Sequence, residues 1–368
     1  MLTTTIQRQN EDHIADHLPS ISVQKAPVSR QSQFNYDDFV FGIQPTDHIF
    51  LCAYKDGTWC DARIVPYQDL QLSPFALCFH YGQTIFEGMK AFRHINGRVS
   101  VFRPDKHYQR LARSLERMCM PVMEESFFTD AVAMLVSVDK HWIPDRGDIS
   151  MYIRPFVIAT EARLGVKVSE EYLFGILCSP MAQYYSKPLR VKVETKYVRA
   201  VSGGVGFAKC GGNYGAAMYP TRQANAEGYD QVLWTDARDH EFLEESGTMN
   251  IMVALEGRII TPPLSDTILD GVTRDSLIQI ARDLNIPVEE RRISYRDLLD
   301  AFWKGKKVEV FGVGTAAVLS PIQVIQIEGN DYAAYTGEDA LMFRLKKELE
   351  NIRTGRSTDK FNWNYFVE

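Results

Sequence analysis

A single lysine lies in the most glycine-rich stretch of the chain, residues 203 to 215, which reads G-G-V-G-F-A-K-C-G-G-N-Y-G. Six glycines flank Lys209 here, and glycine permits positive φ angles and a close approach of the backbone to a ligand. An amine that is partly shielded from water has a lowered pKa, is nucleophilic near neutral pH and can condense with an aldehyde. The segment therefore predicts a Schiff-base lysine.

Two other interpretations compete for this segment. A nucleotide-binding P-loop requires Gly-Lys followed by Ser or Thr, whereas this lysine lies between Ala208 and Cys210, so we reject a nucleotide loop. An ordinary glycine-rich surface turn with a solvated lysine fits the segment equally well when it is taken alone. The choice depends on the residues that follow.

An acidic segment follows the lysine, L-E-E-S-G-T-M-N at residues 243 to 250, directly before a predicted strand. A carboxylate beside a pyridine nitrogen keeps that nitrogen protonated, so that the ring can accept electrons from a substrate carbanion. Glu245 is a candidate for this role. The alternative is a solvated acidic turn, which is the default interpretation for two adjacent glutamates that stand alone.

Two further segments have the features of anion sites. Gly271-Val272-Thr273 precedes a predicted helix, whose free N–H groups and positive dipole end would hold a phosphate. Residues 312 to 317, G-V-G-T-A-A, follow a predicted strand and form a turn that offers backbone donors and a hydroxyl. Each is ambiguous alone, since many helices begin with Thr merely as a cap.

The elements that position these residues fall into two units. In the first, helical patterns alternate with apolar strand-like runs at residues 49–54, 98–102, 150–158 and 172–178, which predicts an α/β domain. One helix begins at Pro104 and carries Leu111, Leu115 and Met118 on an apolar stripe, beside Arg110. In the second, strands 250–255 and 258–261 form a hairpin through Glu256-Gly257, and the helix after residue 274 ends before Pro287.

Chain length, periodicity and proline positions divide the chain further. Because 368 residues exceed what one core usually supports, we expect two domains. Residues 1–30 are polar and without periodicity, which predicts a loosely held extension; residues 31–178 form the small α/β domain. The aperiodic, proline-containing segment 179–188 is the predicted linker, and residues 189–368 form the larger domain.

Composition excludes several classes of protein. Apolar residues make up 45% and charged residues 24%, as in globular proteins, and a net charge of -6 without a basic stripe argues against nucleic acid. No apolar run approaches the ~20 residues that cross a bilayer, and the N-terminus does not resemble a signal peptide, so we expect a cytoplasmic protein. The six cysteines never form C-x-x-C, which predicts reduced, mostly buried thiols and no metal site.

Taken together, the segments resemble the branched-chain-amino-acid aminotransferases of the pyridoxal-phosphate fold-type IV class, from about residue 75 to residue 321. The resemblance rests on seven motifs in chain order: H-Y-G-Q-T-I-F-E-G-M-K-A-F-R (80–93), F-R-P-D-K-H-Y-Q-R-L (102–111), Y-I-R-P (152–155), A-K-C-G-G-N-Y-G (208–215), E-S-G-T-M-N (245–250), D-G-V-T-R (270–274) and G-T-A-A (314–317). It implies a two-domain α/β (α+β) fold: a small N-terminal domain, a larger domain with a barrel-like sheet, and pyridoxal 5'-phosphate in the cleft between them.

The resemblance also implies a role for each site residue. Lys209 holds the cofactor as a Schiff base and carries the proton between substrate Cα and cofactor C4'. Tyr214 binds the phenolic oxygen and Glu245 the pyridine nitrogen. The remaining cofactor contacts implied are Arg110, Thr248, Val272, Thr273 and Thr315, of which Arg110 suits a phosphate because its planar fork donates two hydrogen bonds.

For the substrate, the resemblance implies transamination of leucine, isoleucine and valine with 2-oxoglutarate, giving 2-oxo acids and L-glutamate. Arg154 is available for the γ-carboxylate of glutamate, and the N–H groups of Ala316 and Ala317 for the α-carboxylate. The side-chain pocket is assigned to Tyr81, Phe86, Tyr152 and Tyr184, although for Tyr81, Phe86 and Tyr184 plain core packing is an equally good interpretation.

A homodimer is implied by resemblance alone. The sequence departs from the mitochondrial members in one place, where Ala317 and Ser320 stand instead of their C-x-x-C pair, so thiol-based regulation is not expected. A D-amino-acid aminotransferase or an aminodeoxychorismate lyase would keep the lysine and glutamate with other pocket motifs, and Y-I-R-P and G-G-N-Y-G favour the branched-chain assignment. A catalytically silent binding protein should have lost Lys209 or Glu245, and this chain has both.

Overall fold

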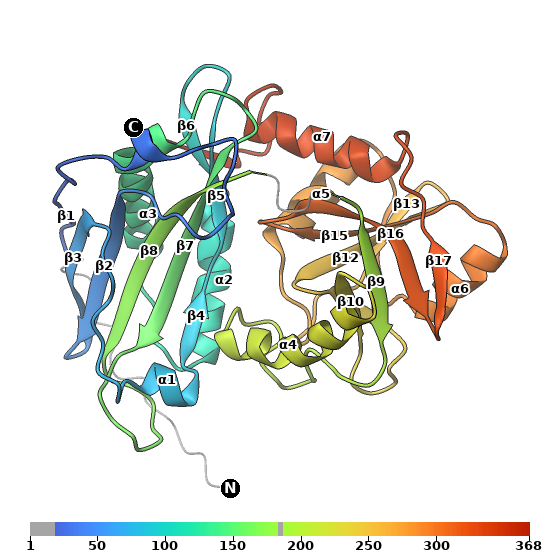
Figure 1. Ribbon diagram of the computed structural model, residues 1–368, viewed down its shortest axis with the longest axis horizontal. Helices are drawn as coiled ribbons and strands as arrows, with labels where there is room; N and C mark the ends of the chain where they lie inside the picture. Colours follow the sequence, from blue (N-terminus) through green and yellow to red (C-terminus); the bar gives the residue numbers. More distant parts are fainter. Residues whose placement is uncertain (1–18, 183–186) are drawn as a thin grey trace, which may run out of the picture.

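The computed structural model describes residues 19–182 and 187–368, which build two β-sheets with helices packed against them (Figure 1). The N-terminal sheet contains β1 (Ser22–Val23), β2 (His48–Lys55), β3 (Thr58–Pro66), β4 (Thr84–Phe86), β5 (Met89–Arg93), β6 (Val99–Phe102), β7 (Ser150–Ala159), β8 (Tyr172–Met181) and β18 (Asn364–Val367). The strand order is β1-β3-β2-β8-β7-β5-β6-β18, with β4 also paired to β7. Every pair is antiparallel except β1 with β3.

The C-terminal sheet contains β9 (Leu189–Glu194), β10 (Gln231–Thr235), β11 (Leu243–Ser246), β12 (Met249–Leu255), β13 (Arg258–Thr261), β14 (Val288–Glu290), β15 (Val308–Gly314), β16 (Val318–Ile327) and β17 (Asn330–Ala333). Its order is β11-β10-β9-β16-β15-β12-β13-β14, with β17 on β16. Because β11 also pairs with β12, six of these strands close into a ring, which is the expected barrel-like sheet.

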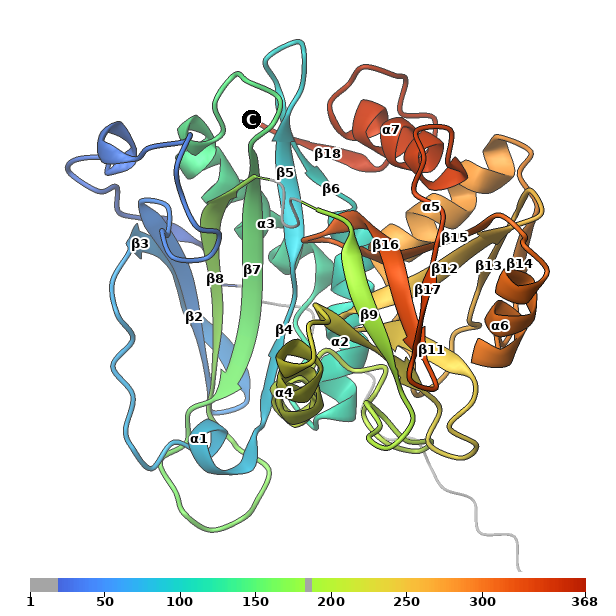
Figure 2. The ribbon, with the colours of Figure 1, turned by 45° about the vertical axis from the view of Figure 1, so that its right-hand side comes forward.

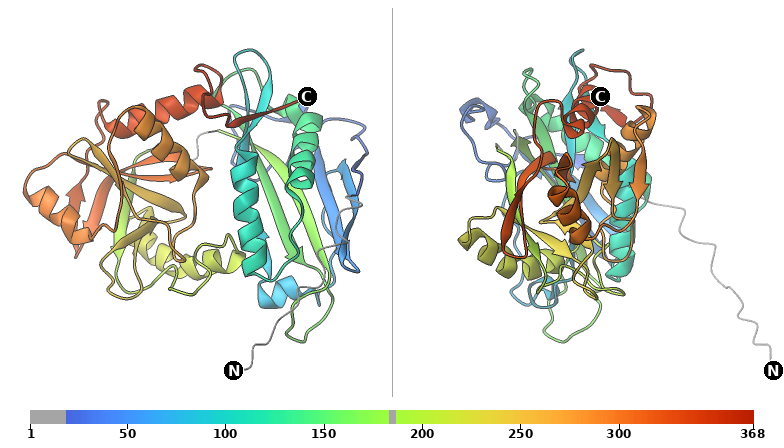
Figure 3. Two further views of the ribbon diagram at one scale, coloured as in Figure 1. Left: turned by 180° about the vertical axis from the view of Figure 1, so that it is seen from behind. Right: turned by 90° about the vertical axis from the view of Figure 1, so that its right-hand side faces the viewer.

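Helices cover the sheets and complete the cores. They are α1 (Leu77–Tyr81), α2 (Pro104–Arg117), α3 (Glu125–Asp139), α4 (Gly211–Ala226), α5 (Val272–Asp283), α6 (Tyr295–Trp303) and α7 (Leu341–Arg353), with 3-10 turns η1 (Gln31–Gln33) and η2 (Lys140–Trp142). Figure 3 (left) shows α2 and α3 side by side over one face of the N-terminal sheet. None of the helices in the described part of the chain is long and apolar enough to cross a membrane.

Apolar side chains from both halves meet at the junction of the two sheets. Phe102 of β6 and Trp363 belong to the same buried cluster as residues of α5, α7 and the barrel, and their rings contact edge to face at 5.7 Å. Burial of such aromatic side chains contributes on the order of 2–3 kcal/mol each. This packing fixes the two halves relative to each other, and the elements that meet there are visible in Figure 2.

The predicted local elements are confirmed. The helix begins at Pro104, directly after Arg103 in the left-handed region (φ 52°), and buries Leu111 and Leu115. The hairpin pairs Leu255 with Arg258 across a two-residue turn. Glu256 and Gly257 both have positive φ angles, 52° and 77°, as in a type I′ turn.

Three features of chain organisation differ from the sequence-based expectation. Within the predicted extension, residues 22–23 pair with β3 as the edge strand of the sheet, while residues 1–18 lie outside the described residues. The predicted linker, residues 179–188, begins inside β8, and its residues 183–186 are also not described. Strand β18, near the C-terminus, pairs with β6 of the N-terminal sheet, so the chain returns to the first half.

Candidate active site

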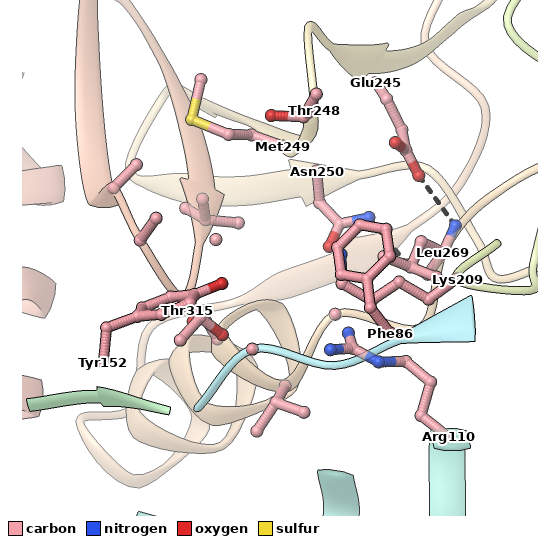
Figure 4. A pocket seen from close by; sticks show the side chains of 18 of the residues that line it. Phe86, Arg110, Tyr152, Lys209, Glu245, Thr248, Met249, Asn250, Leu269 and Thr315 are labelled. Atoms are coloured by element: carbon pink, nitrogen blue, oxygen red, sulfur yellow. Dashed lines mark hydrogen bonds between the residues drawn. The ribbon is translucent and has the colours of Figure 1, made fainter. Parts of the chain in front are cut away.

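A pocket of about 400 Å³ opens between the N-terminal sheet and the barrel, and most of the predicted site residues line it (Figure 4). Its lining residues are Phe41, Phe86, Gly88, Arg110, Tyr152, Arg154, Lys209, Tyr214, Glu245, Thr248, Met249, Asn250, Leu269, Gly271, Val272, Thr273, Val313, Gly314, Thr315, Ala316 and Ala317. They come from strands of both sheets and from α2, α4 and α5, so only the assembled fold forms this pocket.

Lys209 lies just before α4 and points into the pocket instead of outward. Its backbone is fixed from the N-terminal half, because Ser114 accepts its N–H at 3.0 Å and Phe86 donates to its carbonyl oxygen at 3.0 Å. Burial lowers the pKa of the Lys209 amine to about 8, and the Arg110 charge contributes to the same shift. The interpretation as a solvated lysine on a surface turn is therefore wrong.

The glycines around Lys209 have a different purpose from the one expected. In the segment 203–215 only Gly203 has a positive φ angle, and Gly211, Gly212 and Gly215 lie within α4. At Gly211 a Cβ would come within 2.6 Å of the Thr84 hydroxyl, because strand β4 crosses closely there. The glycines serve close packing of the lysine loop against the N-terminal sheet more than unusual backbone angles.

Tyr214 stands one helical turn beyond the lysine on α4. Lys209 Nζ donates a hydrogen bond of 2.6 Å to its hydroxyl oxygen, and the Tyr214 ring lies 4.9 Å from the ring of Phe86. Burial raises the pKa of Tyr214, and nearby Glu245 raises it further. The phenol thus remains protonated, and its hydroxyl can donate a hydrogen bond to a ligand that lies beside the Lys209 amine.

Glu245 lies on β11, where its side chain is buried, and it faces the pocket from the same side as Thr248 (Figure 4). One carboxylate oxygen accepts the Leu269 N–H at 2.7 Å and lies 3.3 Å from the guanidinium of Arg199. Burial raises the pKa of Glu245, and the Arg199 charge opposes that rise. The alternative of a solvated acidic turn is wrong, because Glu244 is buried as well.

The start of α5 closes the pocket opposite the barrel strands. Gly271 precedes the helix, and a Cβ there would overlap Oδ1 of Asn250. The helix N-terminus exposes free N–H groups at Val272 and Thr273. The buried Thr273 hydroxyl finds no hydrogen-bond partner among the described residues, and a phosphate oxygen would supply one. This end of the pocket therefore fits a phosphate group.

Arg110 reaches the same end of the pocket from α2, held by a residue that the sequence analysis missed. Glu87 is fully buried and binds the guanidinium at two points, Nε–Oε1 at 2.7 Å and Nη2–Oε2 at 2.8 Å. His107 contacts the same carboxylate at 2.9 Å, and Arg110 Nη1 donates to the Asp270 carbonyl oxygen at 3.0 Å. The only sequence signal was Glu87 inside the F-E-G motif, where no chemistry had been assigned to it.

The opposite part of the pocket combines apolar rings with one cation. Arg154 Nη2 donates to the Tyr152 hydroxyl at 2.9 Å, and its guanidinium stacks 4.6 Å from the Phe86 ring centroid. A Cβ at Gly88 would overlap the Tyr152 hydroxyl, so only glycine fits beneath that ring. Phe41, which the sequence analysis missed, completes this wall, and its ring lies 5.0 Å from that of Tyr152.

Two predicted substrate residues are not in this lining. Tyr81 ends α1 on the exterior, 41% exposed, where its hydroxyl donates to the Leu164 carbonyl oxygen. Tyr184 lies outside the described residues. The other predicted contacts, including Thr248, Thr315, Ala316 and Ala317, are brought together in one pocket.

Elsewhere in the described part of the chain, the cysteines and one cluster of two acids and a histidine are candidates for redox chemistry or metal binding. All six cysteines are unpaired; Cys52, Cys178 and Cys210 are buried, whereas Cys119 is exposed. Carboxylate and imidazole atoms of Asp47, Asp139 and His141 lie within 4.8 Å of one another. The two carboxylates already accept several hydrogen bonds, including those from Ser29, Trp142 and His48. Contacts within the protein therefore already use these oxygen atoms.

Comparisons with known proteins agree with this geometry. The sequence model of the family described as amino-transferase class IV matches residues 84–325. Branched-chain-amino-acid transaminase 1 of Bacillus subtilis is 47% identical over 329 residues, which cover 88% of this chain and 92% of that protein. This chain belongs to the branched-chain-amino-acid aminotransferase family.

Solved structures of branched-chain aminotransferases resemble the chain over most of its length. The enzyme from Thermoproteus uzoniensis, solved with norvaline, matches with a TM-score of 0.72 and 25% identity, covering 87% of this chain and all of that one. The T.th. enzyme complexed with N-(5'-phosphopyridoxyl)-L-glutamate matches with a TM-score of 0.68 and 25% identity, covering 86% of this chain and 98% of that one. The class IV fold expected from the sequence is thereby confirmed.

Proposed function

We propose that this aminotransferase uses pyridoxal 5'-phosphate to transfer the amino group of L-leucine, L-isoleucine or L-valine to 2-oxoglutarate. The observation that carries the proposal is the Lys209 amine, which lies in one pocket with Tyr214, Glu245 and a phosphate-binding end. The relatives named above act, by their names, on branched-chain amino acids, and one was solved with a phosphopyridoxyl-glutamate adduct.

The residues at hand fit that cofactor. When bound, pyridoxal 5'-phosphate supplies an aldehyde that bonds to an amine and a ring that accepts electrons from the substrate Cα. The donors that would hold its phosphate are Arg110, the N–H groups of Val272 and Thr273, and the Thr315 hydroxyl. Glu245 would keep the ring nitrogen protonated, and the Tyr214 hydroxyl would donate a hydrogen bond to the phenolic oxygen.

Proton movement falls to Lys209. With a pKa lowered to about 8, a useful fraction of the amine is neutral near pH 7, so Nζ is ready to attack an aldehyde carbon. As a free amine, Nζ is the group in this pocket that would accept the proton from the substrate Cα. The Tyr214 hydroxyl, 2.6 Å from Nζ, accepts a hydrogen bond from the amine and holds its orientation.

Substrate choice follows from the wall opposite Glu245. Phe41, Phe86 and Tyr152 present rings that suit a branched aliphatic side chain without a specific polar contact. Arg154, at the edge of these rings, is the cation for the γ-carboxylate of glutamate in the second half-reaction. The N–H groups of Ala316 and Ala317 receive the α-carboxylate.

The decisive experiment follows amino transfer to 2-oxoglutarate from leucine, isoleucine, valine, phenylalanine and D-alanine by a coupled assay. We expect the three aliphatic L-amino acids to be preferred and Lys209→Arg to abolish transfer. A preference for D-alanine would contradict the assignment of the pocket and favour a D-amino-acid aminotransferase. A separate test of the cofactor is the visible absorbance of the purified protein, which borohydride should bleach; a colourless protein that takes up no added cofactor would contradict it.

We further propose that the enzyme is a cytoplasmic homodimer, with the second copy covering apolar side chains around α1. Phe75, Phe79, Leu164, Val166 and Val168 are all exposed there, Val166 to 81%. Apolar groups gathered in this way commonly mark an interface. Such a dimer would also cover Tyr81, whose role as a substrate contact stays a prediction.

The dimer is tested by light scattering coupled to gel filtration. Val166→Asp should give a monomer, because burying an unpaired carboxylate is costly. Ile95→Asp is the matched control, since Ile95 is also exposed (69%) but lies in the turn after β5. A dimer that survives Val166→Asp unchanged would place the interface elsewhere. The division into domains at residues 179–188 likewise stays a proposal, for limited proteolysis to test.

A further inference from the structure

A second cavity, of about 270 Å³, borders the same turn as the active-site pocket, because Ala316 and Ala317 line both. Its walls come from β5, which supplies Lys90, and from α7, the helix along the top of Figure 1. Among the described residues, the lining is Lys90, Phe92, Gly147, Asp148, Ile149, Ser150, Ala182, Ala316, Ala317, Val318, Lys346, Glu350, Arg353, Thr354 and Arg356. Apart from Ala316 and Ala317, none of the residues given a role above lines this cavity.

Positive charge is in excess around the cavity. Four cationic side chains line it, those of Lys90, Lys346, Arg353 and Arg356, against two acids, Glu350 and Asp148. Asp148 is already held by Arg146, with hydrogen bonds of 2.8 and 2.9 Å. Glu350 is half exposed and lies 4.0 Å from Lys346. Neither Lys90 nor Arg353 forms an ion pair with a carboxylate among the described residues, although Glu350 is near enough to oppose the lowering of both pKa values.

Arg353 is the clearest sign of a missing partner. It is 3% exposed, and its Nε and Nη1 atoms are buried without a hydrogen-bond partner among the described residues. The rings of Phe102 and Phe92 lie 4.3 and 5.5 Å from its guanidinium carbon, which offers weak compensation only. A buried guanidinium with unsatisfied donors destabilises the protein unless another group accepts their hydrogen bonds.

Lys90 is in a similar position on the neighbouring strand. It is 5% exposed, and its amine has one hydrogen bond in the described structure, to the Ala316 carbonyl oxygen at 3.1 Å. Burial and the nearby Arg353 charge together lower the pKa of Lys90 to about 7, although Glu350 opposes this shift. Burial likewise lowers the pKa of Arg353 to about 9. Both groups would be stabilised by an anion between them.

We propose that this cavity binds a small oxyanion, a phosphate or a dicarboxylate, through Arg353 and Lys90. Its volume is at or below the lower limit of ordinary ligand pockets, so the ligand is small. The planar fork of Arg353 suits two oxygens of one group, while Lys346 and Arg356 add positive charge at the rim. Since Lys90 also holds the Ala316 carbonyl oxygen, the bound anion adjoins the turn assigned to the substrate carboxylate.

Calorimetric titration of inorganic phosphate into the holoenzyme, at constant ionic strength, tests the proposal. The cofactor fills the active-site phosphate position, so we expect one further saturable site per chain. Lys346→Gln should weaken this binding about fivefold, the effect of one partly exposed charge. Lys347→Gln is the matched control on the next residue of α7, which is exposed and outside the cavity.

A second variant reaches the buried donors. Arg353→Gln should weaken phosphate binding by about tenfold or more, and Arg353→Lys, which keeps the charge, should lose less. Near-ultraviolet circular dichroism shows whether each variant is folded. If Arg353→Gln is not folded, the comparison of phosphate binding by Lys346→Gln and Lys347→Gln tests the proposal. Titration with malonate in place of phosphate shows which of the two ligand classes binds more tightly. Binding in this cavity is recognised by its dependence on Lys346.

Two results would overturn the proposal. One is the absence of any saturable binding of phosphate or malonate to the holoenzyme in the millimolar range. The other is an equal loss of affinity in Lys346→Gln and Lys347→Gln, which would mean general charge screening and no built site. Neither result bears on transamination, which is measured separately.

Discussion

Replacing Glu87 by Gln tests how much the buried ion pair between Glu87 and Arg110 stabilises the protein. The substitution leaves the Arg110 guanidinium buried without its carboxylate partner. Arg110 is 4% exposed and Glu87 fully buried, and the carboxylate accepts two bonds from Arg110 and one from His107. Gln keeps the shape, but it removes the charge and turns an NH2 group toward these donors. Breaking a buried pair from one side costs about 3–5 kcal/mol.

The measurement is urea denaturation of apoenzyme and holoenzyme, followed by circular dichroism. We expect the Glu87→Gln apoenzyme to lose about 3–5 kcal/mol of unfolding free energy. The holoenzyme should lose less, because the cofactor phosphate supplies Arg110 with another negative charge. Glu116→Gln is the control: Glu116 is exposed on α2, the helix that carries Arg110, and its change should stay within about 0.5 kcal/mol.

The pH dependence has a definite sign. Burial alone would raise the pKa of Glu87, but Arg110 and His107 together hold it well below its ordinary value. A carboxylate of this kind contributes its full stabilisation above its unfolded pKa of ~4.3 and loses it as pH falls toward the lowered folded pKa. The difference between the wild type and Glu87→Gln should therefore be constant at neutral pH and shrink below about pH 4.3. A loss of less than about 1 kcal/mol at pH 7, equal in both forms, would refute the reasoning.

Three further predictions follow from the pocket and the fold. Arg154→Gln should raise KM for 2-oxoglutarate by about ten- to a hundredfold while KM for leucine changes little, as measured by steady-state kinetics; equal increases would contradict the assignment. Because the pKa of Lys209 is lowered to about 8, the apoenzyme should combine with the cofactor about tenfold faster at pH 9 than at pH 7 in stopped-flow absorbance; a rise of about a hundredfold, as for a lysine with the ordinary pKa of ~10.4, would argue against that shift. Gly257→Ala should lower the unfolding free energy by about 1–2 kcal/mol in urea denaturation, since Gly257 has φ 77°; an unchanged midpoint would contradict the strain.

Local sequence pattern singled out candidate residues, and the resemblance of several segments to one family decided among the alternatives. Lys209 in its glycine-rich segment, Glu245 and the helix start at Val272 were each ambiguous when taken alone, and all three line the pocket. The hairpin at Glu256-Gly257 was also predictable, because two-residue turns require positive φ angles that few residue types adopt. These are features that a short stretch of chain determines by itself.

Only the tertiary structure decided which distant residues meet. Glu87 is an ordinary acid in the sequence, and its role exists only because β4 and α2 bring it against Arg110, 23 positions away. The pairing of β18 with β6 and of β1 with β3 joins segments far apart in the chain, and no local periodicity encodes that choice. Lys90 is likewise far in the sequence from Lys346, Arg353 and Arg356, and the four cations line one cavity only after folding.

The physical reason is the range of the forces involved. Backbone propensity, capping and turn chemistry act within a few residues, so neighbouring residues determine them directly. Burial, desolvation and ion pairing depend on which surfaces are removed from water together, and they are set when the two sheets pack. Tyr81 shows the difference: its motif predicts a substrate contact, whereas the packing of a single chain leaves it exposed.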